Sequence, residues 1–213
     1  MILIFCGSHG SGKTTLCERI ETGSDLHFFR SEASAIHRSF GVSPGADLPF
    51  ATRFLVQSAI LSNWLSQYAA AKTMGGGIFD RCPIDFAAYM LASTPREADG
   101  RTSFLIQSYI QDCMKACRDL DLLLLCHPHG ARMEARGDDK PDANNEAFAS
   151  LVHHLIVGFL FSHDFDFKNM PAGPVERRLD QVAEHMNVWF KDRAEEAAQS
   201  ERGKCLSRRS LYS

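Results

Sequence analysis

The chain has 213 residues, of which 45% are hydrophobic and 23% charged, a composition that excludes wholesale disorder and suits one globular domain. Its formal net charge of −3 excludes a general polyanion-binding surface, so any phosphate group must be held by local features. No apolar run approaches the length of a membrane span. We therefore expect a cytoplasmic protein that binds neither nucleic acid nor membranes.

The first half of the chain alternates short apolar runs with helical patterns, separated by glycine-rich or proline-containing breaks. The apolar runs predict strands, and the segments between them predict helices. The predicted strands are residues 2–6, 26–29 and 78–80. The predicted helices are residues 12–21, 49–73 and 83–91, with a loop or short helix at residues 31–40.

The second half continues the alternation and ends in a polar, basic tail. Continuous apolar strands separated by helices imply a parallel sheet covered on both faces. We therefore predict an α/β fold of three layers, with five parallel strands flanked by helices. One domain is expected over residues 1–202, and a frayed tail over residues 203–213. The remaining predicted elements are helices at 104–118, 146–161 and 174–199, strands at 122–126 and 165–169, and loops at 95–101 and 127–145.

Residues 7–14, Gly-Ser-His-Gly-Ser-Gly-Lys-Thr, match the pattern G-x-x-x-x-G-K-[ST] at every position, between an apolar strand and a helix. Glycines let backbone N–H groups turn toward phosphate oxygens. In such a loop Lys13 reaches the β- and γ-phosphates, and the hydroxyl of Thr14 ligates Mg²⁺. The motif predicts that the chain binds ATP and Mg²⁺. The expected nucleotide-binding residues are Gly7, His9, Gly10, Ser11, Gly12, Lys13, Thr14 and Thr15.

Residues 79–89, Phe-Asp-Arg-Cys-Pro-Ile-Asp-Phe-Ala-Ala-Tyr, resemble a segment of the P-loop nucleoside and nucleotide kinases. In thymidylate kinases and deoxynucleoside kinases an acid-Arg pair ends the third strand, and a short helix with Ala-Tyr follows. Residues 7–16 also resemble small AAA ATPases related to nicotinamide riboside kinase. The resemblance implies a P-loop kinase fold with a lid.

Asp80 and Arg81 end the third predicted strand, beside the phosphate-binding motif. In open α/β sheets this edge faces the crevice where ligands bind. Asp80 is therefore expected to hold Mg²⁺ together with Thr14. Arg81 is expected to clamp an anionic acceptor or the transferring phosphoryl group. The alternative is a surface acid-base pair at a strand end.

Two further roles follow from the resemblance. It nominates Glu32, after the second strand, as the base that accepts a proton from the acceptor hydroxyl. Ala33 stands where the family often has proline, and a solvated loop glutamate is the alternative. It also places a lid at about residues 127–145, in which Arg132 and Arg136 close over the phosphates. A solvated charged loop is the alternative there, because acidic neighbours balance these arginines.

The sequence as a whole predicts an ATP-dependent kinase of nucleotide metabolism that transfers the γ-phosphoryl group directly to a nucleoside monophosphate or nucleoside. The alternatives are a nucleotide-dependent regulatory ATPase or switch, and a kinase of a coenzyme precursor such as nicotinamide riboside. The long helix at residues 49–73 is a candidate homodimer surface. The expected catalytic residues are Lys13, Glu32, Asp80, Arg81, Arg132 and Arg136.

Overall fold

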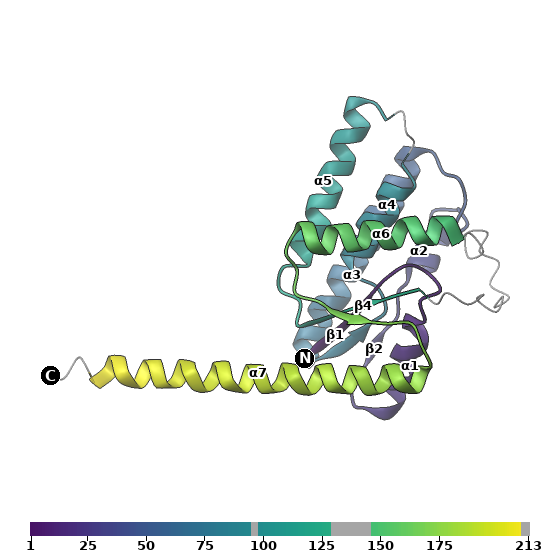
Figure 1. The fold of residues 1–213 in the computed structure, drawn as a ribbon. Helices are drawn as coiled ribbons and strands as arrows, with labels where there is room; N and C mark the ends of the chain where they lie inside the picture. The colour runs from purple at the N-terminus through teal and green to yellow at the C-terminus, as the bar shows by residue number, and fades with distance from the viewer. Residues whose placement is uncertain (95–97, 129–145, 210–213) are drawn as a thin grey trace.

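A parallel sheet of five strands forms the centre of the computed structural model, which describes residues 1–94, 98–128 and 146–209, with the backbone alone for residues 200–209 (Figure 1). The strands lie in the order β2-β3-β1-β4-β5, so β1 is central and pairs with β3 and β4. The predicted α/β fold is confirmed. The strands are β1 (Ile2–Cys6), β2 (Phe28–Phe29), β3 (Gly77–Phe79), β4 (Leu122–Cys126) and β5 (Lys168–Met170).

Helices cover both faces of the sheet and complete the three predicted layers (Figure 1). In this view α4, α5 and α6 lie above the sheet and α7 runs below it. The helices are α1 (Lys13–Gly23), α2 (Ala33–Ser39), α3 (Phe50–Met74), α4 (Pro83–Ala92), α5 (Gly100–Ala116), α6 (Glu146–Ser162) and α7 (Val175–Arg209).

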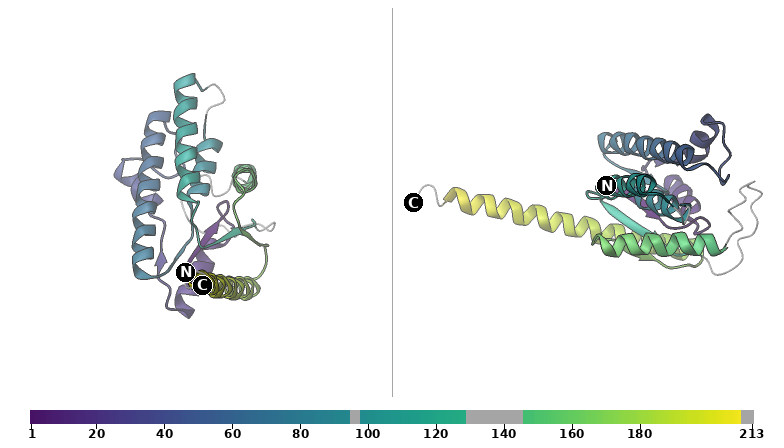
Figure 2. Two further views of the ribbon diagram at one scale, coloured as in Figure 1. Left: turned by 90° about the vertical axis from the view of Figure 1, so that its left-hand side faces the viewer. Right: turned by 90° about the horizontal axis from the view of Figure 1, so that it is seen from above.

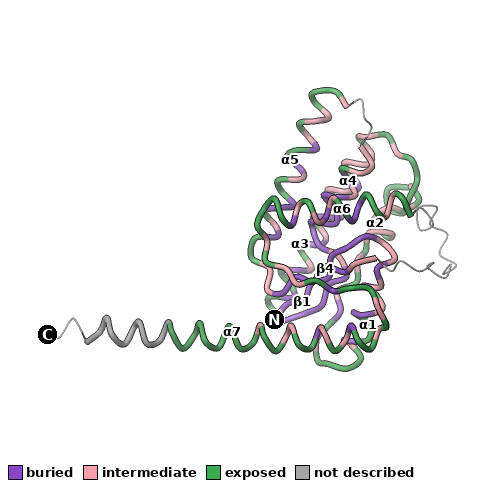
Figure 3. Tube along the Cα trace, viewed as in Figure 1, coloured by how far each residue is buried: buried purple, intermediate pink, exposed green. Residues whose placement is uncertain are grey.

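Strand β1 shows how the sequence builds two cores from one run of apolar residues. Successive strand side chains point to opposite faces. Ile2 and Ile4 pack with the α3–α6 side, whereas Leu3 and Phe5 pack with α1 and α7. All of these side chains are buried (Figure 3), and full burial of one such side chain is worth about 1.5–3 kcal/mol. The central strand is therefore rigidly held, and the residues that follow it are fixed in space.

Helix α7 leaves the body of the protein in its second half (Figure 2). The side chains of residues 190–199 are all exposed. The helix was predicted to end near residue 199, but it extends to Arg209. The division into a domain over residues 1–202 and a tail over residues 203–213 stays a prediction. Among the helices that the structure describes, none combines the length and the apolar composition that a membrane span requires.

Other boundaries also differ from the predictions. Strand β2 has only two residues where four were expected, and β5 begins three residues later and ends one residue later than predicted. Helix α5 begins at Gly100, inside the predicted loop. It starts early because Oδ1 of Asp99 accepts the backbone N–H of Thr102 at 2.7 Å and caps the first turn.

Candidate functional site

The residues of the predicted phosphate loop, residues 7–14, connect the end of β1 to the start of α1. Gly7 has φ +140°, and a Cβ atom there would lie 2.5 Å from the carbonyl oxygen of Cys126 at the end of β4. Gly10 and Gly12 also have positive φ angles of 74° and 77°. The glycines of the motif are therefore required by the backbone conformation itself and by the close approach of β4.

Lys13 is folded back over this loop and is almost fully buried, with 5% of its surface exposed. Its Nζ donates to the carbonyl oxygens of Gly7 and Ser8, both at 2.7 Å, and to Oγ of Ser11 at 3.0 Å. An ammonium group has three donors, so all three are used here. An anionic ligand in the loop would offer this ammonium stronger, charge-assisted hydrogen bonds.

Thr14 and Asp80, the two residues predicted to hold Mg²⁺, lie in direct contact. Oγ1 of Thr14 donates to Oδ2 of Asp80 at 2.8 Å, which joins the start of α1 to the end of β3. Oδ1 of Asp80 is buried and has no hydrogen-bond partner among the residues that the structure describes. A hydroxyl and a carboxylate are the oxygen ligands that Mg²⁺ prefers. The pair therefore fits a Mg²⁺ ion shared with bound phosphates.

Arg81 is held by two neighbouring helices. Nε1 of Trp64 in α3 donates to its backbone carbonyl at 2.9 Å. Its guanidinium carbon lies 5.1 Å from the centre of the Tyr89 ring in α4. Burial lowers the pKa of Arg81, but Tyr89 and Asp85 outweigh burial and raise that pKa above its usual value. Arg81 is thus a fixed cation beside the phosphate loop.

Tyr89 also contacts the phosphate loop. Its hydroxyl accepts the backbone N–H of His9 at 3.0 Å and lies 3.0 Å from Nδ1 of the same histidine. No role for Tyr89 was predicted from the sequence. In the structure, Tyr89 connects His9 to Arg81 and so joins the phosphate loop to the turn after β3.

Two buried ionisable residues near the loop were not predicted from the sequence. Asp85 is completely buried and accepts the backbone N–H of Gly7 at 2.8 Å. Arg178 of α7 has 1% of its surface exposed, and its NH1 donates to the carbonyl oxygen of Ser11 at 2.8 Å. The Cys-Pro-Ile-Asp pattern at a helix start was a usable signal for Asp85. No local pattern pointed to Arg178, which is 167 residues from its partner.

The structure says less about the remaining predicted site residues. Glu32 is exposed just before α2, at the carboxyl end of β2, and within the described residues no hydrogen bond joins it to the phosphate loop or to Arg81. Thr15 lies in the first turn of α1. Arg132 and Arg136, with all but two residues of the predicted lid, lie outside the described residues. The catalytic roles of these residues stay predictions.

A histidine pair joins the end of β4, which His127 follows, to His153 of α6. The rings of His127 and His153 are 5.0 Å apart, and Nε2 of His127 lies 3.0 Å from Oδ1 of Asn169. Burial lowers the pKa of His153 to about 4, and the charges of His127, His154 and Lys13 add to this effect. His153 is therefore neutral at pH 7, and α6 runs within electrostatic reach of Lys13.

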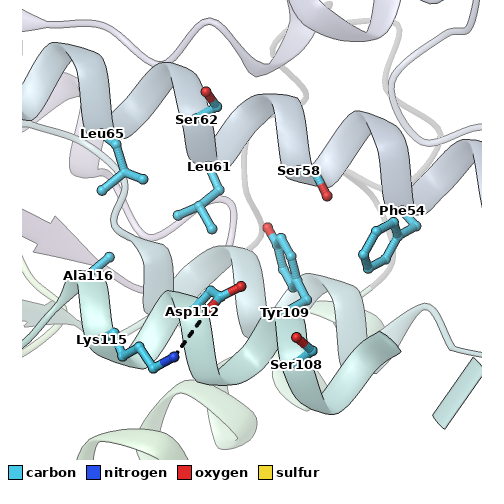
Figure 4. Close-up of a pocket in the computed structure, with 10 residues that line it drawn as sticks. All are labelled: Phe54, Ser58, Leu61, Ser62, Leu65, Ser108, Tyr109, Asp112, Lys115 and Ala116. Atoms are coloured by element: carbon cyan, nitrogen blue, oxygen red, sulfur yellow. Dashed lines mark hydrogen bonds and ion pairs between the residues drawn. The ribbon is translucent and has the colours of Figure 1, made fainter. Parts of the chain in front are cut away.

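A separate cavity of about 560 Å³ lies between α3 and α5 (Figure 4). Phe54, Leu61 and Tyr109 line it together with small polar residues, and Lys115 pairs with Asp112 at its edge. No residue of the phosphate loop or of the turn after β3 contributes to this lining. The cavity is thus distinct from the candidate site.

Solved structures with the same fold include two nucleoside or nucleotide kinases and the NadR protein. A deoxyadenosine kinase from M. mycoides is 17% identical and has a TM-score of 0.68, covering 88% of this chain and 100% of that one. Thymidylate kinase from Candida albicans is 14% identical with a TM-score of 0.64, covering 88% and 91%. The NadR protein in complex with NAD and AMP-PNP is 18% identical with a TM-score of 0.61, covering 87% of this chain and 49% of NadR.

These similarities show that the chain has the fold of the P-loop nucleoside and nucleotide kinases. The model of the AAA domain family AAA_28 matches residues 2–178, and the protein belongs to this family. No curated relative matches the sequence.

Proposed function

We propose that the protein is an ATP- and Mg²⁺-dependent phosphotransferase that transfers the γ-phosphoryl group to a nucleoside monophosphate or a nucleoside. The observation that carries this proposal is the contact between Thr14 and Asp80, made directly beside Lys13 and the phosphate loop. The solved structures with this fold support it, because two of them are deoxyadenosine kinase with bound dATP and thymidylate kinase.

The donor side of the site would bind the triphosphate through the phosphate loop. Its backbone N–H groups and the start of α1 would face the phosphate oxygens, and Lys13 would neutralise the β- and γ-phosphates. Thr14 and Asp80 would hold Mg²⁺, which would supply positive charge to the phosphates. This chain's own contribution is to hold these groups in place before the reaction, which is the main source of catalysis in phosphoryl transfer.

The acceptor side of the site would be organised around Arg81. A guanidinium held over the Tyr89 ring can bind a phosphate through two parallel hydrogen bonds, or stabilise the transferring group if the acceptor is neutral. Glu32 would accept the proton of the attacking hydroxyl. Arg132 and Arg136 would add positive charge and exclude water when the lid closes. Transfer is direct and in line, without a phosphorylated enzyme.

A kinase of a coenzyme precursor is a second candidate function. It is favoured by the similarity to the NadR protein in complex with NR, at 16% identity and a TM-score of 0.58. That comparison covers 79% of this chain and 43% of NadR. A regulatory ATPase of the AAA domain family is the third candidate. It differs in one measurable respect, because its ADP release does not depend on a small-molecule acceptor.

The decisive experiment is an ADP-release assay across nucleosides, nucleoside monophosphates and nicotinamide riboside. We expect acceptor-dependent ADP release by the wild-type protein and its loss in Lys13→Ala, with the fold retained, because Lys13 contacts the loop and fills no core. Lys72→Ala is the matched control, since Lys72 is an exposed lysine at the opposite edge of the sheet. ADP release that is independent of every acceptor would contradict the proposal, as would normal turnover by Lys13→Ala.

A further inference from the structure

The two carboxyl oxygens of Asp85 bind two different parts of the candidate site. Oδ2 accepts the backbone N–H of Cys82 at 2.8 Å, which caps the start of α4. Oδ1 accepts the backbone N–H of Gly7, the first residue of the phosphate loop, also at 2.8 Å. Capping a helix needs only the first of these bonds. The second bond joins residues 78 positions apart and fixes α4 to the phosphate loop.

Gly7 is held between Asp85 on one side and β4 on the other. Its backbone is so close to the carbonyl group of Cys126 that a Cβ atom would collide with it. Its own carbonyl oxygen accepts Nζ of Lys13 at 2.7 Å. A displacement of Gly7 would therefore move a hydrogen-bond partner of Lys13, the residue expected to contact the transferred phosphate.

Cys82 follows directly on Asp80 and Arg81. A fixed N–H group at Cys82 therefore restrains the turn that carries both of these side chains. Burial raises the pKa of Asp85 to about 8, whereas the charges of Lys13 and Arg81 lower it. The carboxyl group thus lies within electrostatic reach of the cations on both sides of the candidate site.

We propose that Asp85 is a positioning residue for phosphoryl transfer, because it holds the phosphate loop and the turn after β3 in one relative arrangement. This proposal rests on the proposed function. Asp85 is not itself a base or a metal ligand, since it is completely buried and both of its oxygens are already engaged. It acts through Gly7 on Lys13, and through Cys82 on Asp80 and Arg81.

The chain contains a matched control for this bond. Oδ2 of Asp121 accepts the backbone N–H of Ile2 at 2.8 Å. That bond has the same chemistry and the same length as the bond from Gly7 to Asp85, and it is made at the opposite end of the same strand. It touches no residue of the candidate site. Loss of either bond removes one carboxyl contact with β1, but only one of the two contacts restrains the site.

The experiment compares Asp85→Asn with Asp121→Asn, each assayed well below its own unfolding temperature so that both are fully folded. Asparagine keeps the volume but replaces one carboxyl oxygen, which can accept a hydrogen bond with or without the proton, with an NH2 group that cannot accept one, which leaves one N–H group without a partner. We expect kcat/KM for ATP to fall about 10²-fold in Asp85→Asn, the typical cost of a misplaced reacting group, and to stay near wild type in Asp121→Asn. Wild-type kcat/KM in a folded Asp85→Asn would overturn the proposal, as would an equal loss in both variants.

Two further measurements keep the proposal testable. If Asp85→Asn does not fold, amide hydrogen exchange of the wild-type protein is measured with and without ADP. The proposal expects the Gly7 and Cys82 amides to exchange as slowly as those of β1 in both states, and exchange as fast as an exposed loop amide overturns it. If the wild-type protein transfers no phosphoryl group, the proposed function fails separately. The Kd for ADP then tests the role of Asp85. We expect this Kd to rise in Asp85→Asn and to stay near the wild-type value in Asp121→Asn, and an unchanged Kd in Asp85→Asn would overturn the proposal.

Discussion

The two ends of strand β1 make the same kind of hydrogen bond in different surroundings. At the amino end the N–H of Ile2 donates to Asp121, and the nearby α-amino group of Met1 donates to the carbonyl of Gly75 in an exposed position. At the carboxyl end the N–H of Gly7 donates to the buried Asp85. Lys13 lies at this second end, and the Thr14–Asp80 pair lies beside it.

This difference follows from the geometry of a parallel sheet. All strands end at the same edge, and the helices that follow them begin there with N–H groups that have no partner within the helix. Side chains that satisfy those groups are thereby brought close to one another and to any anion bound at the edge. A lost bond at the amino edge costs only stability, about 1 kcal/mol. A lost bond at the carboxyl edge also moves groups that are candidates for catalysis.

The strongest test of this comparison is Asp80→Asn. Loss of a metal-binding carboxylate removes several kcal/mol of charge stabilisation, so we expect kcat to fall on the order of 10³-fold. Steady-state assays over a range of Mg²⁺ concentrations measure the effect, and added Mg²⁺ should restore part of it. Asp121→Asn, the corresponding change at the amino edge, should keep its activity. A normal kcat in Asp80→Asn would show that Asp80 does not bind a catalytic Mg²⁺ ion.

Glu32→Gln extends the comparison to the end of β2. Glutamine keeps the shape of Glu32 and removes its basicity, so kcat should fall by at least ~10²-fold if Glu32 is the base. The Kd for ATP should hardly change, because the role proposed for Glu32 concerns the acceptor and not ATP. Rapid-quench measurements of the chemical step, with an ATP titration alongside, separate the two quantities. A normal rate of the chemical step would make Glu32 an ordinary exposed residue of the loop before α2.

Arg81→Lys distinguishes the two classes of acceptor. Lysine keeps the charge but cannot bind a phosphate through two parallel hydrogen bonds and loses the contact of the guanidinium with the Tyr89 ring, so the affected constant should change by about tenfold or more. For a nucleoside monophosphate the KM for the acceptor should rise while the KM for ATP changes little. For a neutral nucleoside the loss should appear in kcat, because that interaction strengthens in the transition state. Steady-state kinetics that leave both constants unchanged would contradict either role.

The pH dependence of stability offers a test of Asp85 that needs no substrate. Its pKa is raised from 3.8 to about 8 by burial. Between these two pH values the folded protein keeps a proton that the unfolded chain has released, so this group makes the protein less stable as the pH rises. The contribution is about 1.4 kcal/mol per pH unit within the window.

Urea denaturation of wild type and Asp85→Asn from pH 5 to pH 8 measures this contribution as a difference. The free energy of unfolding of Asp85→Asn should fall less steeply with pH than that of the wild type. Equal slopes in wild type and Asp85→Asn would show that Asp85 titrates near its ordinary pKa.

Much of the candidate site could be predicted because its signals are local in the chain. The loop from Gly7 to Thr14 is a contiguous motif with its strand on one side and its helix on the other. Asp80 could be chosen because it ends an apolar run, and every parallel strand ends at the same edge of the sheet. The contact between Thr14 and Asp80 follows from these two positions together with the pairing of β1 and β3.

The contacts of Asp85 and Arg178 could not be predicted in the same way. Each side chain makes a hydrogen bond to a backbone group of the phosphate loop that is far away in the chain. Every residue type except proline has the same backbone N–H and C=O groups, so the residue type does not indicate such a partner. The same limit applies to Glu32, whose distance from the acceptor side depends on how α2 packs. The early start of α5 was missed for a local reason, the cap formed by Asp99.

The sequence alone determined the fold class and the loop that is expected to hold phosphates, because periodicity and short motifs are properties of neighbouring residues. The tertiary structure alone decided the strand order and the partners of Asp85, Tyr89 and Arg178. Burial is the physical reason why these partners depend on the tertiary structure. A polar group removed from water must find a partner wherever the packed chain provides one, and that place is set by how the layers meet.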